Sequence, residues 1–166
     1  MDFSKRLSMS YYKEIAVLNN GHNVCLVQHQ ETQKIYVRKI LDVYNSGIYH
    51  HLQSVKVDGI PKIIEFHEEN SVLTLVEEYI SGETLQDKIN AHSLTLTEIC
   101  IYMEELCTIL AKLHRLNPPI IHRDIKPENI IITSCNHVVL IDFNAAKYFT
   151  DINTPDTILL GTKGYA

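Results

Sequence analysis

The segment from residue 120 to residue 144, IIHRDIKPENIIITSCNHVVLIDFN, constrains this chain more than any other part of it. It contains two short apolar runs, NIIIT and HVVLIDF, which are separated by the polar turn SCN. This pattern predicts a small β-hairpin. Charged and amide side chains are concentrated at the two ends of that hairpin, where a rigid scaffold commonly presents reactive groups. The segment therefore predicts a functional site.

Three oxygen-bearing side chains of this segment are spaced for metal binding. Asp124 and Asn129 lie on one loop, which we expect Pro127 to keep from becoming helical. Asp142 follows the hairpin, which can return it to the side of Asn129. Carboxylate and amide oxygens are suitable ligands for Mg²⁺. Asp124 is then placed to accept a proton from an attacking hydroxyl, while Lys126 stabilises charge on a transferred group.

The same segment resembles two sequence motifs of protein kinases. Residues 122–129 read HRDIKPEN, against the catalytic-loop pattern HRDxKPxN, and residues 142–144 read DFN, against the magnesium motif DFG. So many fixed residue types at the right spacing rarely arise by chance, and a plain polar turn would leave the clustered charges without a purpose. The chain is identified as resembling a serine/threonine protein kinase of the bacterial type.

The resemblance implies ATP and Mg²⁺ as cofactors, a protein serine or threonine as substrate, and a role for each motif residue. These roles are catalytic base for Asp124, Mg²⁺ ligand for Asn129 and Asp142, and phosphate contact for Lys126. Arg123 matches the arginine that can receive a phosphate from the activation segment. His122 and Phe143 match residues that align the site by packing. We therefore expect His122 to be structural rather than an acid or a base.

The first half of the chain predicts five antiparallel strands and one helix. The strands are expected at residues 13–18, 24–29, 34–41, 62–69 and 72–80, and the helix at 43–55. Beyond them, Thr84 and Asp87 have the spacing of a capping box and start a helix over 84–92, and apolar residues at three- and four-residue steps predict another over 97–114. This is an α+β, protein-kinase-like fold: an N-lobe over 1–77, a hinge over 78–82 and part of a mainly helical C-lobe over 83–166.

The resemblance also places a nucleotide site in the first half. Lys39 stands where the family has the phosphate-binding lysine of the VAIK motif, and Val37 occupies the alanine position. The segment LVEEYISGETL resembles the hinge, so residues 78–82 should contact the adenine edge through backbone groups. The residues implied in nucleotide binding are Gly21, Val37, Lys39, Glu77, Glu78, Tyr79 and Ile80.

Two motifs depart from the family at positions that carry glycine. In NNGHNVCL the central Gly21 is kept, whereas Asn19 and Val24 replace the outer glycines of GxGxxGxV. Asparagine tolerates left-handed backbone and is the milder change, while the β-branched Val24 is the harder one. Asn144 replaces the glycine of DFG, so metal binding by Asp142 is expected to survive with a stiffer backbone switch.

The expected helix over 43–55 lacks the glutamate that pairs with the lysine in this family. No acidic residue lies between Asp42 and Asp58, and the register places Asn45 or Gly47 at that site. We expect Glu77, at the gatekeeper position before the hinge, to be the counterion of Lys39, because a buried unpaired carboxylate would be costly. The alternative is a partly hydrated Glu77 without a role.

Composition limits the partners and the location. A formal net charge of −5 without a long basic run gives no footprint for nucleic acid. No signal peptide or membrane-spanning segment is recognisable, and four scattered cysteines without CxxC pairing suggest reduced thiols, so we expect a cytoplasmic location. The 45% hydrophobic content is enough for a globular core.

The resemblance stops inside the activation segment, where GTKGYA matches the start of GTxxYxAPE. We therefore expect a truncated kinase whose last long helix and hairpin leave apolar surface uncovered, to be covered by a regulatory protein or by a second copy. The segment carries four threonines that phosphorylation could pair with Arg123: Thr150, Thr154, Thr157 and Thr162.

Three functions fit these observations. The first is a serine/threonine kinase domain, or the N-terminal portion of one. The second is a pseudokinase or truncated module that binds nucleotide or a protein without turnover, which the eroded glycine loop and the missing helix glutamate favour. The third is a small-molecule phosphotransferase of the aminoglycoside-kinase kind, which usually has Gly or Asn at the position of Arg123 and lacks the Lys126-Pro127 pair.

Overall fold

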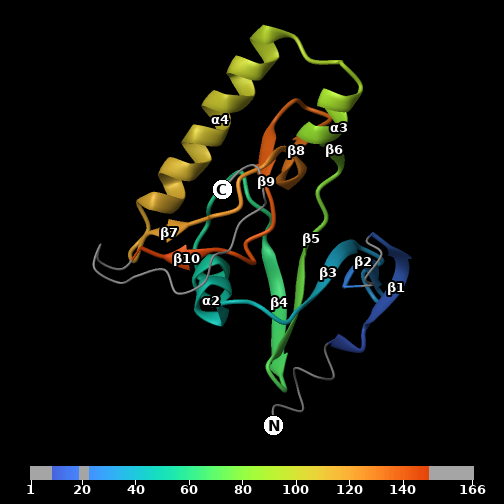
Figure 1. Ribbon diagram of the computed structural model, residues 1–166. Coiled ribbons are helices and arrows are strands. Elements are labelled where there is room, and N and C mark those ends of the chain that lie inside the picture. The colour runs from blue at the N-terminus through green and yellow to red at the C-terminus, as the bar shows by residue number, and fades with distance from the viewer. Residues whose placement is uncertain (1–8, 19–22, 150–166) are drawn as a thin grey trace.

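The computed structural model describes residues 9–18 and 23–149, and the first half forms a five-stranded antiparallel sheet (Figure 1). The strand order across the sheet is β1-β2-β3-β5-β4. The bounds are β1 Tyr12–Val17, β2 Val24–His29, β3 Ile35–Leu41, β4 Ile63–Glu69 and β5 Val72–Glu78. The five predicted strands are confirmed, each boundary lying within about two residues of its predicted position.

The helix α2, Ser46–Ser54, packs against this sheet and is shorter than the helix predicted over 43–55. It begins at Ser46 because Asn45 caps it: the Asn45 side chain accepts a hydrogen bond from Gly47 N at 3.1 Å. Ile48 and Leu52, one turn apart, are buried in the core beneath the helix. The apolar side of the helix therefore positions it, and no ion pair joins α2 to another described residue.

The strand β5 is the most buried strand of the sheet. It lies between β3 and β4, and Leu73, Leu75 and Val76 on its two faces are fully buried. Its buried polar residue is Glu77, close to the end of the strand. Burying a carboxylate in such a strand is costly unless a partner of opposite charge is nearby.

The second half begins with two helices whose starts are set by capping boxes. In α3, Leu85–Asn90, the predicted box is present, since Thr84 accepts from Asp87 N and Asp87 accepts from Thr84 N. The long helix α4, Leu96–His114, is confirmed as well, and it begins with a second box formed by Thr95 and Glu98. These reciprocal bonds satisfy backbone N–H groups that the first helical turn leaves without partners.

The predicted hairpin is present as β8, Ile130–Thr133, and β9, Val138–Leu140. A third strand, β6 (Gly82–Thr84), adds to β8, and β10 (Lys147–Tyr148) pairs with β7 (Ile120–Ile121). These three strands are not predicted by the sequence, because two or three residues show no periodicity. Gly82 allows the β6 pairing, since a Cβ at this position would lie 2.4 Å from the Ile132 carbonyl oxygen.

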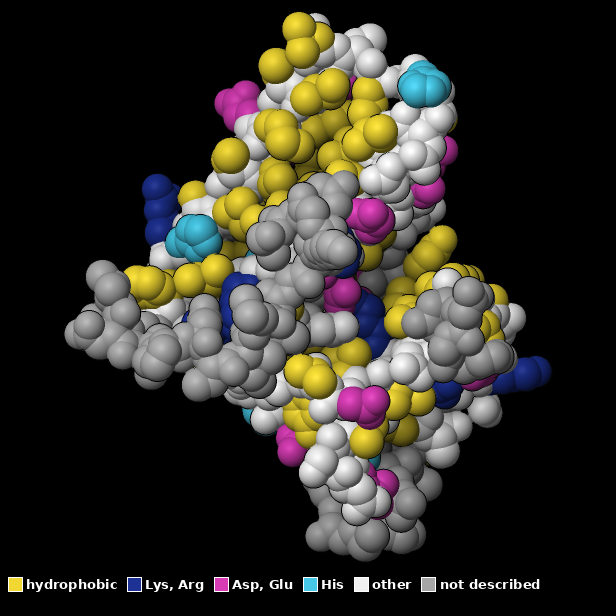
Figure 2. Space-filling view, in the orientation of Figure 1, with side chains coloured by type: hydrophobic (Ala, Val, Ile, Leu, Met, Phe, Trp, Pro, Cys, Tyr) yellow, Lys and Arg dark blue, Asp and Glu magenta, His cyan; other side chains and the backbone are white. Residues whose placement is uncertain are grey.

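One hydrophobic core cluster runs through both halves of the molecule, and it takes in the hairpin. The prediction of uncovered apolar surface is confirmed for α4, whose upper part carries exposed side chains (Figure 2): Leu96, Ile99, Ile101 and Met103. For the hairpin the prediction is wrong, because its apolar side chains pack into the core beside α4: Ile130, Ile132, Val138 and Leu140. That a protein or a second copy covers α4 stays a prediction.

Within the described part of the chain, no helix combines the length and the apolar character that crossing a membrane requires. All four cysteines carry free thiols: Cys25 is buried in the sheet, and the other three are exposed. The division into an N-lobe over 1–77, a hinge and a partial C-lobe stays a prediction.

Candidate active site

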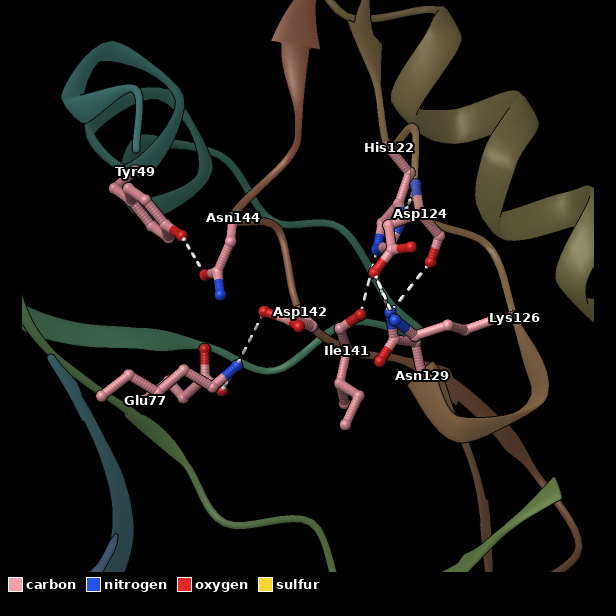
Figure 3. A network of polar contacts seen from close by, with 10 residues as sticks. Tyr49, Glu77, His122, Asp124, Lys126, Asn129, Ile141, Asp142 and Asn144 are labelled. Atoms are coloured by element: carbon pink, nitrogen blue, oxygen red, sulfur yellow. Dashed lines mark hydrogen bonds and ion pairs between the residues drawn. The ribbon is translucent and has the colours of Figure 1, made fainter. Parts of the chain in front are cut away.

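The loop between β7 and β8 brings three polar side chains together at Asp124 (Figure 3). Asn129 Nδ2 donates hydrogen bonds to Asp124 Oδ2 and to the Asp124 carbonyl oxygen, both at 2.9 Å. Lys126 Nζ forms an ion pair with Asp124 Oδ2 at 2.8 Å. The side chains of Asp124 and Lys126 are only 17% and 19% exposed, so solvent screens their attraction less than on an open surface. The three residues are neighbours, as their spacing predicts.

A short 3₁₀ turn, Pro127–Asn129, returns the loop toward Asp124. The expectation that Pro127 keeps the loop from being helical is therefore wrong over these residues. Proline occupies the first position of the turn, where its missing N–H needs no partner and its fixed φ suits a helical start. Asn129 N closes the turn on the Lys126 carbonyl oxygen at 3.0 Å, which aims the Asn129 amide back at Asp124.

His122 joins the catalytic loop to the strand that leads to Asp142. The imidazole is buried, its Nε2 donates to the Ile141 carbonyl oxygen at 3.0 Å, and its Nδ1 accepts from Asp124 N at 3.3 Å. Burial lowers the pKa of His122, outweighing the hydrogen bond to Ile141 and the charges of Asp142 and Asp124, which act in the opposite direction. Phe143 packs edge-on against the ring, with centroids 4.8 Å apart. These contacts agree with the structural role predicted for His122.

Asp142 follows β9, and backbone contacts hold it beside the catalytic loop. Ile141 N donates to the Asn129 carbonyl oxygen at 2.9 Å, so the residue before Asp142 is tied to the loop. Asp142 itself has a φ of 70°, in the left-handed region that few residues other than glycine occupy, and Arg123 has a φ of 69°. Such strained backbone persists where the surroundings hold it firmly, as commonly occurs at functional sites.

The donor atoms here fit a divalent cation. Asp142 Oδ1 is buried and has no hydrogen-bond partner among the described residues, and it forms an ion pair with Lys39 Nζ at 3.6 Å. The Asn129 amide nitrogen is turned toward Asp124, which leaves the amide oxygen to serve as a ligand. A buried carboxylate oxygen without a hydrogen-bond partner and a nearby amide oxygen form the kind of oxygen donor set that Mg²⁺ prefers.

Lys39 forms the predicted ion pair with Glu77. Lys39 Nζ lies 2.8 Å from Glu77 Oε1, and each side chain is about 7% exposed. In the β3–β5 pairing Val37 is opposite Glu77 and Lys39 is opposite Leu75, so the pair is a diagonal contact across two adjacent strands. Burial would lower the pKa of Lys39, but the charges of Glu77 and Asp142 outweigh it and raise the pKa. The ammonium group is thus held charged, and the alternative of a hydrated, unpaired Glu77 is wrong.

The helix α2 reaches the site through Tyr49, and neither Asn45 nor Gly47 does so. Asn45 caps the helix, and Gly47 receives a hydrogen bond on its carbonyl oxygen from Tyr148 at 2.7 Å. The Tyr49 hydroxyl donates to Asn144 Oδ1 at 3.0 Å (Figure 3). The residue of α2 that faces the site is therefore Tyr49 and not Asn45 or Gly47. The partner of Lys39 comes from Glu77 in the sheet, as expected.

A cavity of about 140 Å³ opens between the sheet and the second half, beside Lys39. It is lined by six residues implied in nucleotide binding: Val37, Lys39, Glu77, Glu78, Tyr79 and Ile80. Gly21 lies outside the described residues. Larger hollows, of about 570 and 530 Å³, lie by the α2–β4 connection and by α4, and neither is lined by Lys39, Asp124 or Asp142.

Sequence reasoning missed the apolar lining of this cavity: Leu18, Val24, Pro61, Ile131 and Ile141. The sequence could have indicated Ile141 as a lining residue, since it directly precedes Asp142. Val24, which replaces an outer glycine of the family loop, is opposite Lys39 in the β2–β3 pairing and lines the cavity. Tyr49 gave no signal, because a tyrosine on an amphipathic helix is usually a core residue. The four threonines of the activation segment lie outside the described residues.

Comparison with known proteins places this geometry in a family. The sequence profile of the protein kinase domain matches residues 19–166. The chain belongs to the protein kinase family. The match includes every motif described above, from the glycine-loop segment to the start of the activation segment. The five-stranded sheet with its helix, followed by the start of the helical half, agrees with the predicted kinase fold.

Several curated kinases are similar to this chain. Serine/threonine-protein kinase DCLK3 of Mus musculus is 31% identical over 83% of the chain, and a putative serine/threonine-protein kinase of Mycoplasma genitalium is 29% identical over 98%. The probable serine/threonine-protein kinase pknA2 of Bifidobacterium longum is 36% identical over 68%. The chain spans 20%, 46% and 15% of the length of these three relatives.

In this kinase domain the catalytic loop keeps every fixed residue of the family pattern. The lysine site keeps the lysine but takes its carboxylate from β5, and α2 contacts Asn144, which follows Asp142 and Phe143 in the DFN segment. The differences from the family are therefore concentrated around Lys39 and α2.

Proposed function

We propose that this chain is a catalytic part of a serine/threonine protein kinase that transfers the γ-phosphate of ATP to a protein hydroxyl. The observation that carries the proposal is the convergence of Asp124, Lys126 and Asn129 within hydrogen-bond distance of one another, with Asp142 tied to the same loop. Asp142 also lies 3.6 Å from Lys39 at the edge of the cavity. Phosphoryl transfer depends mainly on such positioning and charge.

Asp124 is the proposed proton acceptor for the substrate hydroxyl. As the hydroxyl oxygen forms its bond to the γ-phosphorus, the bond to the β–γ bridging oxygen breaks, and ADP leaves with that electron pair. The hydroxyl proton passes to the Asp124 carboxylate. Lys126 Nζ, 2.8 Å from Asp124 Oδ2, orients the carboxylate and offers positive charge to the transferred group. Asn129 Nδ2 donates to the same oxygen and helps to fix the carboxylate.

Lys39 is the proposed contact for the nucleotide phosphates, and Glu77 keeps its ammonium group charged and in place. Asp142 and Asn129 would hold Mg²⁺, which when bound neutralises charge on the phosphates. The apolar walls of the cavity, including Val37 and Ile141, suit a flat base, and backbone groups of residues 78–82 would contact its edge.

We also propose serine or threonine as the acceptor, the bacterial type of kinase and a cytoplasmic location. Lys126 beside Asp124 favours serine and threonine over tyrosine, and bacterial kinases are among the relatives. The four free thiols support a cytoplasmic location. Phosphoamino acid analysis of the product would test the acceptor, because phosphotyrosine as the main product would contradict this part of the proposal.

The test is transfer of labelled γ-phosphate from Mg·ATP to a generic protein substrate and to the chain itself. The Asp124→Asn variant keeps the shape of the side chain and removes the base. We expect at least about 100-fold less transfer in the variant and unchanged nucleotide affinity. Folded protein that binds Mg·ATP but gives no more transfer than the variant would instead support a pseudokinase that binds nucleotide without turnover.

A further inference from the structure

Among the described residues, two hydrogen bonds join the helix α2 to the second half of the molecule, and neither involves Lys39. The Tyr49 hydroxyl donates to Asn144 Oδ1 at 3.0 Å, and the Tyr148 hydroxyl donates to the Gly47 carbonyl oxygen at 2.7 Å. Since Lys39 is paired with Glu77 inside the sheet, a shift of α2 would leave the lysine pair intact. The same shift would act directly on Asn144.

Asn144 lies two residues beyond Asp142, whose backbone is in the left-handed region with a φ of 70°. On the near side Ile141 is fixed by two hydrogen bonds, one to the Asn129 carbonyl oxygen and one from His122 Nε2. On the far side, the side-chain bond from Tyr49 fixes Asn144. A strained residue keeps its conformation when both flanks are held, so the Tyr49–Asn144 bond adds to the packing of Phe143 on His122 in holding the far side of Asp142.

Tyr49 is suited to be a permanent donor in this bond. Its side chain is 1% exposed, and it packs at 6.3 Å between ring centroids from Phe66 of β4. Burial, with the negative charges of Glu77 and Asp142, raises the pKa of Tyr49, so the hydroxyl keeps its proton. The acceptor, Asn144, occupies the position where the family pattern has glycine, which has no side chain to offer.

We propose that Tyr49 and Asn144 are positioning residues for the metal-binding carboxylate of Asp142, so that α2 is coupled to the cation rather than to the lysine. In this arrangement the sheet holds Lys39 by itself, and the position of α2 sets how well Asp142 and Asn129 form a Mg²⁺ site. The inference rests on the proposed function, because it assumes that Asp142 holds Mg²⁺ next to a nucleotide.

The test is the Mg²⁺ dependence of nucleotide binding, measured with a fluorescent ATP analogue over a titration of MgCl₂ and again in EDTA. Tyr49→Phe removes only the donor hydroxyl. We expect it to raise the Mg²⁺ concentration at half-maximal binding about tenfold, the size typical of residues that orient metal ligands. Analogue binding in EDTA should stay unchanged, because Lys39 and the cavity are not touched.

Tyr148→Phe is the matched control, since the one hydroxyl bond that it removes also ends on this helix but starts from Tyr148 and not from residues 142–144. It should leave the Mg²⁺ midpoint near the wild-type value. Asn144→Ala should raise the midpoint about as much as Tyr49→Phe, and the double variant should raise it no further, because both changes remove one bond.

Several outcomes would overturn the inference. One is an unchanged Mg²⁺ midpoint in Tyr49→Phe while the wild-type chain binds Mg·nucleotide, which would refute the coupling and leave the proposed function standing. Equal shifts in Tyr49→Phe and Tyr148→Phe would assign the effect to the general stability of α2. Fully additive shifts in the double variant would mean that the two residues act separately. Absence of nucleotide binding by the folded wild-type chain would refute the proposed function itself.

Discussion

In the catalytic loop the groups that meet at Asp124 come from residues 122 to 129, whereas Lys39 and Glu77 meet from strands that are far apart in the sequence. The loop keeps every fixed residue of the family pattern. The lysine site departs from it, since α2 has no acidic residue and the partner comes from β5. In both sites, nevertheless, a carboxylate and an ammonium group form an ion pair: Asp124 with Lys126, and Glu77 with Lys39.

The difference shows how each site depends on sequence. In the loop, one turn and three side chains must fit within a few residues, so a changed residue has no nearby substitute. At Lys39 the requirement is one carboxylate within reach of a buried ammonium group. Any neighbour on the same face of the sheet can meet it, and Glu77 does so diagonally across β3 and β5. The lysine site therefore tolerates a change that the loop would not.

The largest expected effect tests the Lys39–Glu77 pair, in which β5 supplies the carboxylate that the family has on the helix. Glu77→Gln should lower the free energy of unfolding by about 3 kcal/mol, since it leaves a buried charge without its closest partner. It should also weaken Mg·ATP binding about tenfold, because Lys39 is then drawn toward Asp142, 3.6 Å away, and competes with the cation for it. Chemical denaturation and calorimetric titration with Mg·ATP would measure both effects.

Glu83→Gln is the control for this variant, because the Glu83 side chain is 70% exposed and pairs loosely with Lys88 at 3.6 Å. The same chemical change there should leave stability and nucleotide affinity near the wild-type values. If Glu77→Gln binds Mg·ATP as tightly as the control does, Glu77 has no part in the nucleotide site, and the comparison between the two regions loses its basis.

A second, smaller effect tests the support of the catalytic loop. Gly82→Ala would place a Cβ 2.4 Å from the Ile132 carbonyl oxygen, so β6 must move away from β8. We expect a loss of about 2 kcal/mol in unfolding free energy, read by denaturant titration. Phosphate transfer should fall more than nucleotide affinity, because β8 directly follows the turn that carries Asn129. If Gly82→Ala has the wild-type free energy of unfolding, the β6–β8 pairing accommodates the added methyl group and the expected loss is wrong.

The smallest effect is a pH dependence that comes from His122. Its pKa is lowered by burial below the ordinary value of 6.5, so on acidification the unfolded chain takes up a proton that the folded chain does not. Stability should therefore be full above about pH 6.5 and fall as the pH decreases from there, by less than about 1.4 kcal/mol per pH unit.

His122→Gln should flatten this dependence between about pH 7 and pH 5, and unfolding free energies measured at several pH values would show it. His114→Gln, at the exposed end of α4, is the control and should keep the wild-type slope. If stability depends equally on pH in all three proteins, folding does not lower the pKa of His122. The folded chain then takes up the same proton as the unfolded chain, contrary to a neutral imidazole between Asp124 and Ile141.

Much of the fold follows from local pattern. The strands of the sheet were predictable from runs of β-branched and aromatic residues, and the start of α3 from the Thr84–Asp87 capping box. The short strands β6, β7 and β10 were not, because they form only where another strand offers unpaired backbone groups. The helical turn at Pro127 was missed because we expected proline to prevent a helix. Proline does so only in the interior of a helix, whereas Pro127 occupies the first position of the turn.

The sequence by itself determined the family and the catalytic loop, because the residues that meet at Asp124 are neighbours along the chain and their spacing fixes their geometry. It also suggested Glu77 as the partner of Lys39, by showing that α2 has no carboxylate to offer. Only the tertiary structure decided that this pair is formed across β3 and β5, and that Tyr49 reaches Asn144. Both contacts join segments that are distant in the sequence, where strand register and helix packing set which side chains meet.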